Sequence, residues 1–547
     1  MRFLKSMLFI FVGLPYFVFS QVSINEFPED LQLYKRDITS NTARVTISGE
    51  VGISSGFSLF TLEVYKDNML VESIPHSLSY NNNVASFEFS EDITAGLFQY
   101  DFKLKTDTDI LLKEAYNVVA GDIYILNGQS NVIRHRYAND PFPHQSNFIR
   151  TFLLETQEWS TDPNPFVFGG VGYSFAASIV VNQNVPVLLL NGGEGGKVIS
   201  HFQRNDEFIT DPDTNYGRLL NRYSLANFTR GDVKGIIWFQ GEANSSTSIT
   251  NYVAVFTDLY EAWEEDYTPD QYYIFQVRYG CTITEYTDYK KIFQAPEANR
   301  RLGLLPKTKV ISSNAITKGD DNCHYYGTSG YADLAKRLYD LVAYDFYNST
   351  NDSGIYSPNI DNVRFTGASK NQIRFDLIPA SDVYTWQNGV ENDFWIEGTT
   401  DIFITDGCVL GSTVTLNLSG NSTEADPKLS YLGHNPNDTP FIINQNGIGM
   451  LSFKNVSISN SVLEDDTLFS GNLSIYPNPA TATLNVDWEF PCNSRMIIYD
   501  VSGKKVYEKN NNRNQQIKID VSNWSSGNYF LKIINQYATS VKMIIVN

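Results

Sequence analysis

The sequence contains few of the residues that most often bind zinc. Only 4 cysteines and 6 histidines occur among its 547 residues. Neither a CxxC pair nor an HExxH segment is present, and this argues against a Cys/His zinc site. We therefore expect no metal centre.

Positive charge is also scarce. Lysine and arginine number 41 against 61 aspartates and glutamates, which gives a net charge of −20 at pH 7. The phosphates of nucleic acids and anionic membranes would be repelled, so these partners are disfavoured. A neutral or mildly charged sugar polymer is compatible with this charge.

Long apolar segments are missing after the first residues. The stretch from Met7 to Phe19 follows Arg2 and Lys5, is too short to span a bilayer and leads to the small residue Ser20. We expect residues 1–20 to be a signal peptide. No later segment predicts a membrane span, so an exported, soluble protein is expected.

Apolar residues make up 42% of the chain and aromatic residues 14%, enough for several domains with large cores. Between residues 21 and 115, apolar and polar residues alternate, as in ARVTISGEV and FSLFTLEVY, with turns such as KDN between the runs. This alternation predicts a small antiparallel β-sandwich of about seven strands.

The pattern changes over residues 116–348. Short, nearly continuous apolar runs (DIYIL, VPVLLLN, VKGIIWFQ, YYIFQV, TKVISS) alternate with helical stretches such as NYVAVFTDLYEAWEED. Continuous runs are typical of strands buried on both faces of a parallel sheet, so we expect a doubly wound α/β domain.

Alternating β patterns return after this region. We expect a β-rich domain over 349–462, a linker over 463–472 and a second compact β-sandwich over 473–547. The predicted fold is therefore multidomain, with a central doubly wound α/β domain flanked by β-sandwich domains.

Polar segments follow the apolar runs of the α/β region. These segments are GQSN, GGEGGK, QGEAN and GDDNCHYYG. The carboxyl ends of parallel strands meet at one edge of a sheet, where ligands bind. The sequence therefore predicts a site at this edge.

Ser130 is the candidate nucleophile of this site, with Gly128 permitting a sharp turn before it. Only one histidine, His324, has a carboxylate three residues earlier, Asp321. In a tight turn this spacing lets Asp321 accept from Nδ1 while Nε2 faces the serine. The alternatives are that Ser130 caps the next helix and that His324 lies in a polar surface loop. The convergence of all four segments favours catalysis.

A serine nucleophile also needs donors for the oxyanion. The backbone N–H of Ser130 is one candidate, and that of Gly196 is the preferred second, with Gly195 close behind. The side-chain amide of Gln240 is the expected third, and Asn244 is the alternative.

Two further residues are expected to support the site. Glu242 follows Gly241 and is predicted to brace its loop through hydrogen bonds, and Asn131 lies beside the nucleophile. Phosphate binding by GGEGGK is disfavoured, because a P-loop requires Ser or Thr after the lysine and Val198 follows Lys197.

These segments resemble the SGNH hydrolase superfamily and, more narrowly, the sialate O-acetylesterase-like proteins and carbohydrate esterase family six. The matching segments are GQSN (128–131), GGEGGK (192–197), WFQGEAN (238–244) and DNCH (321–324). The resemblance implies that Ser130, Asp321 and His324 form a catalytic triad and that Gln240 replaces the asparagine of the wider superfamily. EGGK departs from the commoner GGT of the family. Residues 349–462 resemble the β-rich region that follows the hydrolase core in sialate O-acetylesterases.

The C-terminal region resembles the type A sorting domain of type IX secretion in Bacteroidetes. The matching segments are YPNPATATLNV, YDVSGKKV and SSGNYFLKI. The resemblance implies that the type IX machinery exports the protein across the outer membrane of a Bacteroidetes-like bacterium, followed by release or surface attachment.

The predicted function is that of a secreted serine esterase that removes O-acetyl groups from carbohydrate through an acetyl-enzyme, with no cofactor. A catalytically silent carbohydrate-binding or surface-adhesion protein is the main alternative, and a lipase or phospholipase ranks lower. Sialic acid, xylan and algal or pectic polymers are all compatible with the sequence as the acetylated substrate.

A disulfide between Cys281 and Cys323 is also expected. Cys281 follows YYIFQV, and Cys323 lies between Asp321 and His324, so both would lie beyond neighbouring strand ends. The alternative is two unpaired, buried cysteines.

Overall fold

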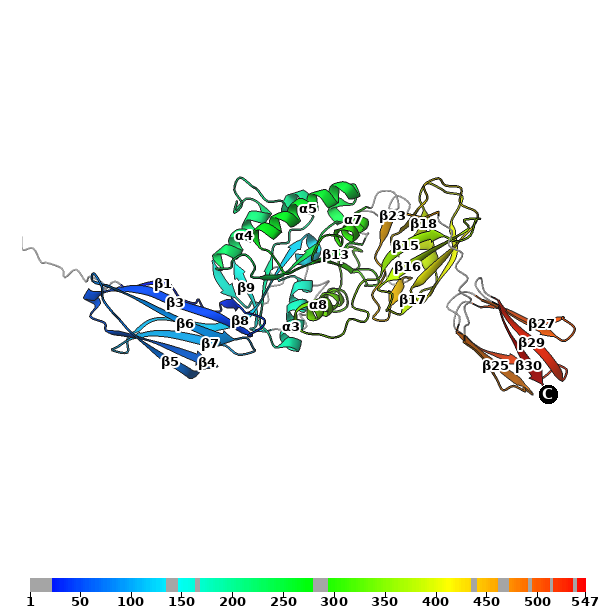
Figure 1. Ribbon diagram of the computed structural model, residues 1–547, viewed down its shortest axis with the longest axis horizontal. Coiled ribbons are helices and arrows are strands. Elements are labelled where there is room, and N and C mark those ends of the chain that lie inside the picture. Colours follow the sequence, from blue (N-terminus) through cyan, green and yellow to red (C-terminus); the bar gives the residue numbers. More distant parts are fainter. Residues whose placement is uncertain are drawn as a thin grey trace, which may run out of the picture. The chain divides into compact units, whose positions relative to one another are not determined.

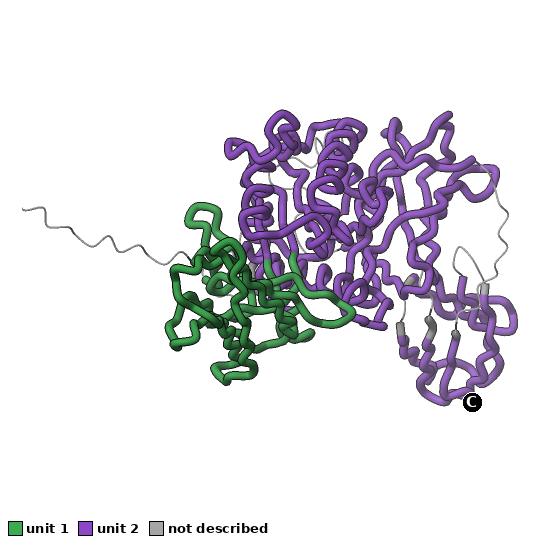
Figure 2. Tube along the Cα trace, turned by 60° about the vertical axis from the view of Figure 1, so that its left-hand side comes forward, with its two compact units in different colours: residues 1–123, 146–162, 179–188 green, residues 124–145, 163–178, 189–547 purple. Residues whose placement is uncertain are grey.

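The computed structural model describes residues 22–133, 146–162, 168–278, 294–433, 440–460, 472–489, 494–511, 515–534 and 539–547. The chain divides into two compact units, shown in green and purple in Figure 2. Unit 1 comprises residues 1–123, 146–162 and 179–188, and unit 2 comprises residues 124–145, 163–178 and 189–547. The expected signal peptide lies outside the described residues.

Unit 1 contains a three-stranded antiparallel sheet and the antiparallel strands of a larger mixed sheet, and both contribute to one apolar core. β3 pairs with β1 and β6, while β4 pairs with β5 and β7. Alternate residues of β3, such as Val45 and Ile47, are buried in the core, as a strand with one solvated face requires. The strands that lie within unit 1 are β1 (Val22–Glu26), β2 (Leu33–Lys35), β3 (Thr42–Gly52), β4 (Leu59–Lys66), β5 (Met69–Ser77), β6 (Val84–Thr94), β7 (Tyr100–Thr106), β9 (Ile149–Leu153) and β10 (Glu158–Ser160).

One sheet contains β9, β11, β8, β12, β13 and β14 in this hydrogen-bonded order, and its strands β12, β13 and β14 lie in unit 2. Pairing of β12 with β13 and of β13 with β14 is parallel, and every residue of β12 is buried. A strand without polar alternation suits a sheet that is covered on both faces. The strand bounds are β8 (Leu111–Gly128), β11 (Val187–Asn191), β12 (Val233–Phe239), β13 (Gln271–Gln276) and β14 (Thr308–Ser312).

Helices cover both faces of this sheet. In Figure 1, α4, α5 and α7 lie on one side of the strands and α8 on the other. Trp238 of β12 packs edge-on against Trp263 of α5, and the hydroxyl of Tyr124 in β8 lies 3.1 Å from that of Tyr347, just after α8. The helix bounds are α1 (Ser130–Ile133), α3 (Gly170–Gln183), α4 (Asn215–Leu225), α5 (Ile249–Asp266), α7 (Ala295–Leu302) and α8 (Ala332–Phe346).

The rest of unit 2 is made of strands with two separate apolar cores. One core includes Phe375, Trp386 and Phe453, and the other includes Leu484 and Leu531. The strands of the first are β15 (Asn359–Phe365), β16 (Gln372–Ile378), β17 (Tyr384–Trp386), β18 (Phe394–Ile396), β19 (Ile404–Leu410), β20 (Thr413–Leu418), β21 (Lys428–Tyr431), β22 (Ile442–Asn444) and β23 (Phe453–Ser457). Those of the second are β24 (Asn472–Tyr476), β25 (Thr483–Glu489), β26 (Ser494–Asp500), β27 (Lys505–Asn511), β28 (Gln515–Asp520), β29 (Gly527–Ile534) and β30 (Thr539–Val546).

Within the described ranges, no helix has the length and apolar character needed to cross a membrane. In the same ranges, no group of three or more His, Cys, Asp or Glu side chains could hold a metal ion.

Candidate active site

The candidate nucleophile lies at a tight turn between β8 and α1. Gly128 has φ +136°, and a Cβ at this position would lie 2.2 Å from the carbonyl oxygen of Phe239. Only glycine therefore fits where the ends of β8 and β12 meet. Gln129 ties the two ends together, because its N–H donates to Phe239 O (3.0 Å) and its Oε1 accepts from the N–H of Ala243 (3.1 Å).

Ser130 is partly exposed, and its Oγ makes no hydrogen bond with any residue that the structure describes. A serine that caps a helix uses its oxygen to accept from a backbone N–H. Ser248 does so at the start of α5, where it accepts from Asn251 N–H at 3.2 Å. The capping interpretation of Ser130 therefore lacks the hydrogen bond on which it depends.

Asn131, the residue that follows the nucleophile in the sequence, is fully buried. Its side chain forms hydrogen bonds with two other segments. Its Nδ2 donates to Glu242 Oε1 (2.8 Å), and its Oδ1 accepts from the hydroxyl of Tyr331 (3.0 Å). The loop after β12 and the segment before α8 thus both hold the turn that carries Ser130. This contact gives Glu242 the bracing geometry that was expected.

The loop of residues 192–197 lies beside the nucleophile. A Cβ at Gly195 would be 3.9 Å from Ser130 Cβ, and the N–H of Glu194 donates to Gly128 O (2.9 Å). Gly195 and Gly196 are exposed, and their N–H groups donate to no residue in the described part of the chain. Of these two residues, the structure places Gly195 next to Ser130.

Gln240 has a different environment from the one expected of an oxyanion donor. It is fully buried, and its Nε2 donates to Lys197 O (3.1 Å) and to Asn244 Oδ1 (2.6 Å). Its Oε1 accepts from the hydroxyl of Tyr252 (2.7 Å). Both amide hydrogens are therefore used to hold the 192–197 loop and the loop after β12 together, and donation to an oxyanion would require one of these bonds to break. Asn244 is likewise engaged, because its Oδ1 also accepts from Ile199 N–H (2.9 Å).

Asp321 and His324 form a close pair in the loop after β14. His324 Nδ1 lies 2.6 Å from Asp321 Oδ2, while Asp321 Oδ1 accepts from the backbone N–H groups of Cys323 (3.0 Å) and His324 (2.9 Å). Burial raises the pKa of Asp321, but the hydrogen bonds from His324 and Cys323 outweigh it and the net pKa is lowered. An ionised Asp321 can thus fix the imidazole with Nε2 directed away from the carboxylate.

No hydrogen bond joins Ser130 to His324, both of which the structure describes. The Nε2 of His324 lies 4.0 Å from Cys323 Sγ. Catalytic hydrogen bonds of ligand-free enzymes are often long and tighten only when substrate binds. The structure therefore brings Asp321 and His324 together, and Ser130 beside Gly195, whereas the contact between the two groups stays a prediction.

Cys323 is disulfide-bonded in this loop, and so is Cys408. A free thiol at position 323 is thereby excluded. Cys281, the expected partner of Cys323, lies outside the described residues, so the predicted pairing stays a prediction.

Sequence reasoning missed the network that anchors the 192–197 loop. The carboxylate of Glu194 accepts from Asn215 Nδ2 (2.9 Å), lies 2.9 Å from His201 Nε2 and pairs with Arg218. Burial raises the pKa of Glu194, but the hydrogen bonds from Asn215 and His201 outweigh it and the net pKa is lowered. The three partners lie 21, 7 and 24 residues away along the chain, so no local spacing reveals them.

This network predicts a role for Glu194 in positioning the free N–H groups of the loop. We expect Glu194→Ala to lower kcat by about tenfold with KM little changed, since misplacing a catalytic group by about 1 Å costs up to 10²-fold. Glu194→Gln keeps an acceptor for Asn215, so its kcat should lie between that of Glu194→Ala and that of wild type. Steady-state hydrolysis of a chromogenic acetyl ester measures this, and an unchanged kcat for Glu194→Ala would contradict the assignment.

Comparison with known proteins assigns two domains of the chain to families. Residues 120–343 match the family described as carbohydrate esterase, sialic acid-specific acetylesterase, and residues 474–547 match the secretion system C-terminal sorting domain. The chain therefore carries a carbohydrate esterase domain and a sorting domain for type IX secretion, which directs export to the cell surface or outside. The resemblances to sialate O-acetylesterases and to the sorting domain of type IX secretion are confirmed.

Solved structures add a likeness in fold. A carbohydrate acetylesterase from Xanthomonas citri is 18% identical, with 79% of this chain and 99% of that chain covered and a TM-score of 0.56. A protein of Arabidopsis thaliana is also 18% identical, with coverage of 41% and 99% and a TM-score of 0.34. At this identity, the first likeness shows a shared fold. None of the curated proteins that were compared matches the chain.

Proposed function

We propose that this secreted esterase is a serine hydrolase that removes O-acetyl groups from carbohydrate. The observation that carries the proposal is an unbonded Ser130 Oγ on a residue that lies beside Gly195, whose N–H group, like that of Gly196, donates to no described residue. The Asp321–His324 pair lies in the loop at the carboxyl end of β14, a strand of the same sheet. A nucleophile, oxyanion donors and an oriented base are the groups that acyl transfer requires.

Acylation begins when Ser130 Oγ attacks the acetyl carbonyl carbon and His324 Nε2 takes the hydroxyl proton. The N–H groups of Gly195, Gly196 and Ser130 donate to the oxyanion. As the bond from carbon to the sugar oxygen breaks, His324 returns the proton to that oxygen, and the acetyl group stays on Ser130.

Deacylation repeats these steps with water. His324 removes a proton from water, the hydroxide attacks the acetyl carbon, and acetate leaves as Ser130 Oγ regains the proton. Neither half of the reaction calls for a metal or an organic cofactor.

Two assays test the proposal. Hydrolysis of a chromogenic acetyl ester separates an esterase from a catalytically silent carbohydrate-binding or adhesion protein. Acetate release from a panel of acetylated substrates (sialic acid, xylan, pectic and algal polymers) then identifies the sugar. Absence of acetate release from every acetylated carbohydrate, with hydrolysis of long-chain acyl esters instead, would favour a lipase.

The C-terminal sorting domain is predicted to be dispensable for hydrolysis. Its apolar core is separate from that of the preceding strands, and none of the candidate catalytic residues lies in it. A chain that ends at Asp465 should keep its kcat within about twofold, because surface changes remote from a site rarely alter its geometry. Loss of activity with an unchanged melting temperature would show instead that the C-terminal region contributes to the site.

A further inference from the structure

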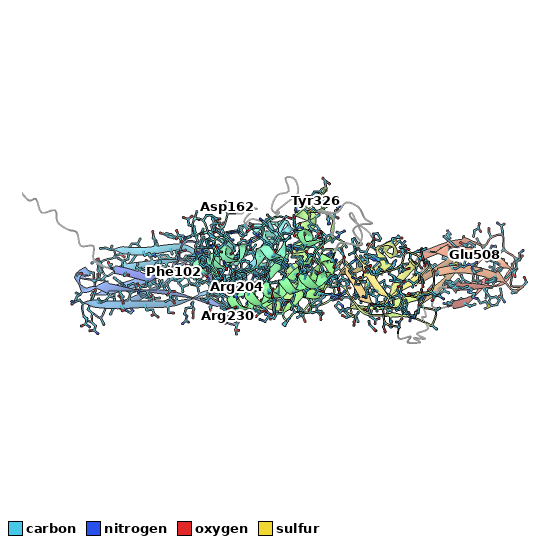
Figure 3. The ribbon with its side chains drawn as sticks, turned by 90° about the horizontal axis from the view of Figure 1, so that it is seen from above. Phe102, Asp162, Arg204, Arg230, Tyr326 and Glu508 are labelled. Atoms are coloured by element: carbon cyan, nitrogen blue, oxygen red, sulfur yellow. The ribbon has the colours of Figure 1, made fainter. Side chains whose placement is uncertain are left out.

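Tyr325 directly follows His324 in the sequence, and its side chain is buried. It is 1% exposed, and its ring meets the ring of Tyr331 edge-on, with the ring centroids 5.7 Å apart. This is a favoured geometry of aromatic pairs, which stabilises them beyond the burial of their area. The candidate base therefore lies next to a side chain that the interior of the protein holds in place. Figure 3 labels Tyr326, the next residue along the chain.

The backbone between the two tyrosines turns back and brings their rings together. The carbonyl oxygen of Tyr326 accepts from the N–H groups of Gly330 (2.9 Å) and Tyr331 (2.7 Å). A Cβ at Gly330 would lie 2.6 Å from Tyr325 Cβ. Only glycine therefore fits at this position, and the close packing of the turn fixes where Tyr331 lies relative to Tyr325.

The hydroxyl of Tyr331 contacts the nucleophile's side of the site. Tyr331 is fully buried, and its hydroxyl donates to Asn131 Oδ1 (3.0 Å). Asn131 is fully buried as well and follows Ser130, so this hydrogen bond restrains the turn that carries the nucleophile. Tyr331 thus contacts Asn131 through its hydroxyl and Tyr325 through its ring.

A second contact joins the same two segments. The ring centroid of Tyr325 lies 6.4 Å from that of Phe239. The carbonyl oxygen of Phe239 accepts from the N–H of Gln129 (3.0 Å), the residue before Ser130. The loop of His324 and the turn of Ser130 are therefore connected through packed side chains, although these two residues, both described, share no hydrogen bond.

We propose that Tyr331 is a positioning residue of the esterase, which fixes the position of the base relative to the nucleophile. The inference rests on the proposed function of Ser130 and His324. These residues follow different strands, β8 and β14, so the chain itself does not determine the distance between them. A catalytic site needs such support from residues whose own side chains are held by packing and hydrogen bonds. Because Tyr331 is fully buried, it acts without contacting substrate.

Tyr331→Phe tests the hydroxyl in the full-length protein. It keeps the ring beside Tyr325 and removes the hydroxyl that donates to Asn131. We expect kcat for a chromogenic acetyl ester to fall by about tenfold, within the 10²-fold effect of a misplacement of about 1 Å. KM should change by less than about twofold, because a group that only positions the reacting atoms leaves substrate binding intact. A kcat within about twofold of wild type would overturn the inference.

Tyr223→Phe is the matched control for the loss of a buried hydroxyl. Tyr223 lies in α4, is 2% exposed, and its hydroxyl donates to the carbonyl oxygen of Thr229 (2.5 Å). Each variant loses one hydrogen bond, so both should lower the melting temperature by a few degrees. Tyr223→Phe should nevertheless keep kcat within about twofold of wild type. Equal losses of kcat in the two variants would show a general effect of destabilisation and would contradict a positioning role.

A double-mutant cycle shows whether the hydroxyl acts through Asn131. Asn131→Ala also removes the contact with Glu242, so we expect it to lower kcat by about 30-fold. Two residues that act through one shared hydrogen bond have effects that do not add. The double variant should therefore be no slower than Asn131→Ala. Effects that multiply would show that the hydroxyl acts by another route, against the inference. If Asn131→Ala does not fold, the comparison of Tyr331→Phe with Tyr223→Phe decides alone.

Ser130→Ala separates this inference from the proposed function. If Ser130→Ala stays active, the proposed function fails, and the positioning role fails with it. If Ser130→Ala is inactive while Tyr331→Phe has the kcat of wild type, only the positioning role fails. An inactive Ser130→Ala together with a tenfold slower Tyr331→Phe, at constant KM, supports both.

Discussion

Ser130→Ala should lower kcat for acetyl ester hydrolysis by about 10³-fold or more, as removal of a triad nucleophile does in other serine hydrolases. The fold should stay intact, because Ser130 Oγ makes no hydrogen bond with the described residues and its loss leaves no buried group without a partner. The melting temperature should therefore match that of wild type, although kcat is strongly reduced.

Ser248→Ala provides the matched control for this result. Ser248 is a true helix cap, and its substitution removes the hydrogen bond to Asn251 at the start of α5. It should lower the free energy of unfolding by about 1 kcal/mol with little change in kcat. If Ser130→Ala is instead less stable but active, as expected for Ser248→Ala, then Ser130 is a helix cap. The assignment of Ser130 to a catalytic triad would be wrong.

Much of the parallel sheet could be predicted from single runs of sequence. VKGIIWFQ and TKVISS correspond to β12 (Val233–Phe239) and β14 (Thr308–Ser312), because a strand buried on both faces needs no polar alternation. The change of pattern near residue 116 does not coincide with a break in structure. β8 continues from Leu111 to Gly128, and its first residues alternate in exposure while its last are all buried.

The polar contacts of the site could not be predicted in the same way. Asn131 and Glu242 are 111 residues apart, and their hydrogen bond depends on how two loops fold against each other. Gln240 is an example. Its position directly after a strand predicts a side-chain amide that is free to bind substrate, whereas in the structure this amide donates to Lys197 and Asn244. Residue type and strand order locate the edge of the sheet, but the partners of each side chain are fixed by loop conformation.

The contact between Asp321 and His324 is the one polar contact of the site that the sequence predicts, because both residues lie in one turn. The geometry of this turn predicts a second large loss of kcat, in the variant Asp321→Asn. The oxygen of the new amide should stay on the N–H groups of Cys323 and His324, which now bind Asp321 Oδ1. The amide nitrogen would then face His324 Nδ1 and donate to it. This arrangement places the proton of a neutral imidazole on Nε2. A protonated Nε2 cannot accept the hydroxyl proton of Ser130.

We therefore expect Asp321→Asn to lower kcat at neutral pH by about 10³- to 10⁴-fold with KM little changed, as a wrong histidine tautomer does in other triads. Asp320→Asn is the matched control, because this neighbouring carboxylate accepts only from the hydroxyl of Tyr326 (2.7 Å) among the described residues. It should keep kcat within about threefold, as surface substitutions usually do. Equal losses in the two variants would mean that the loop tolerates no substitution, whereas a kcat for Asp321→Asn within tenfold of wild type would remove Asp321 from the triad.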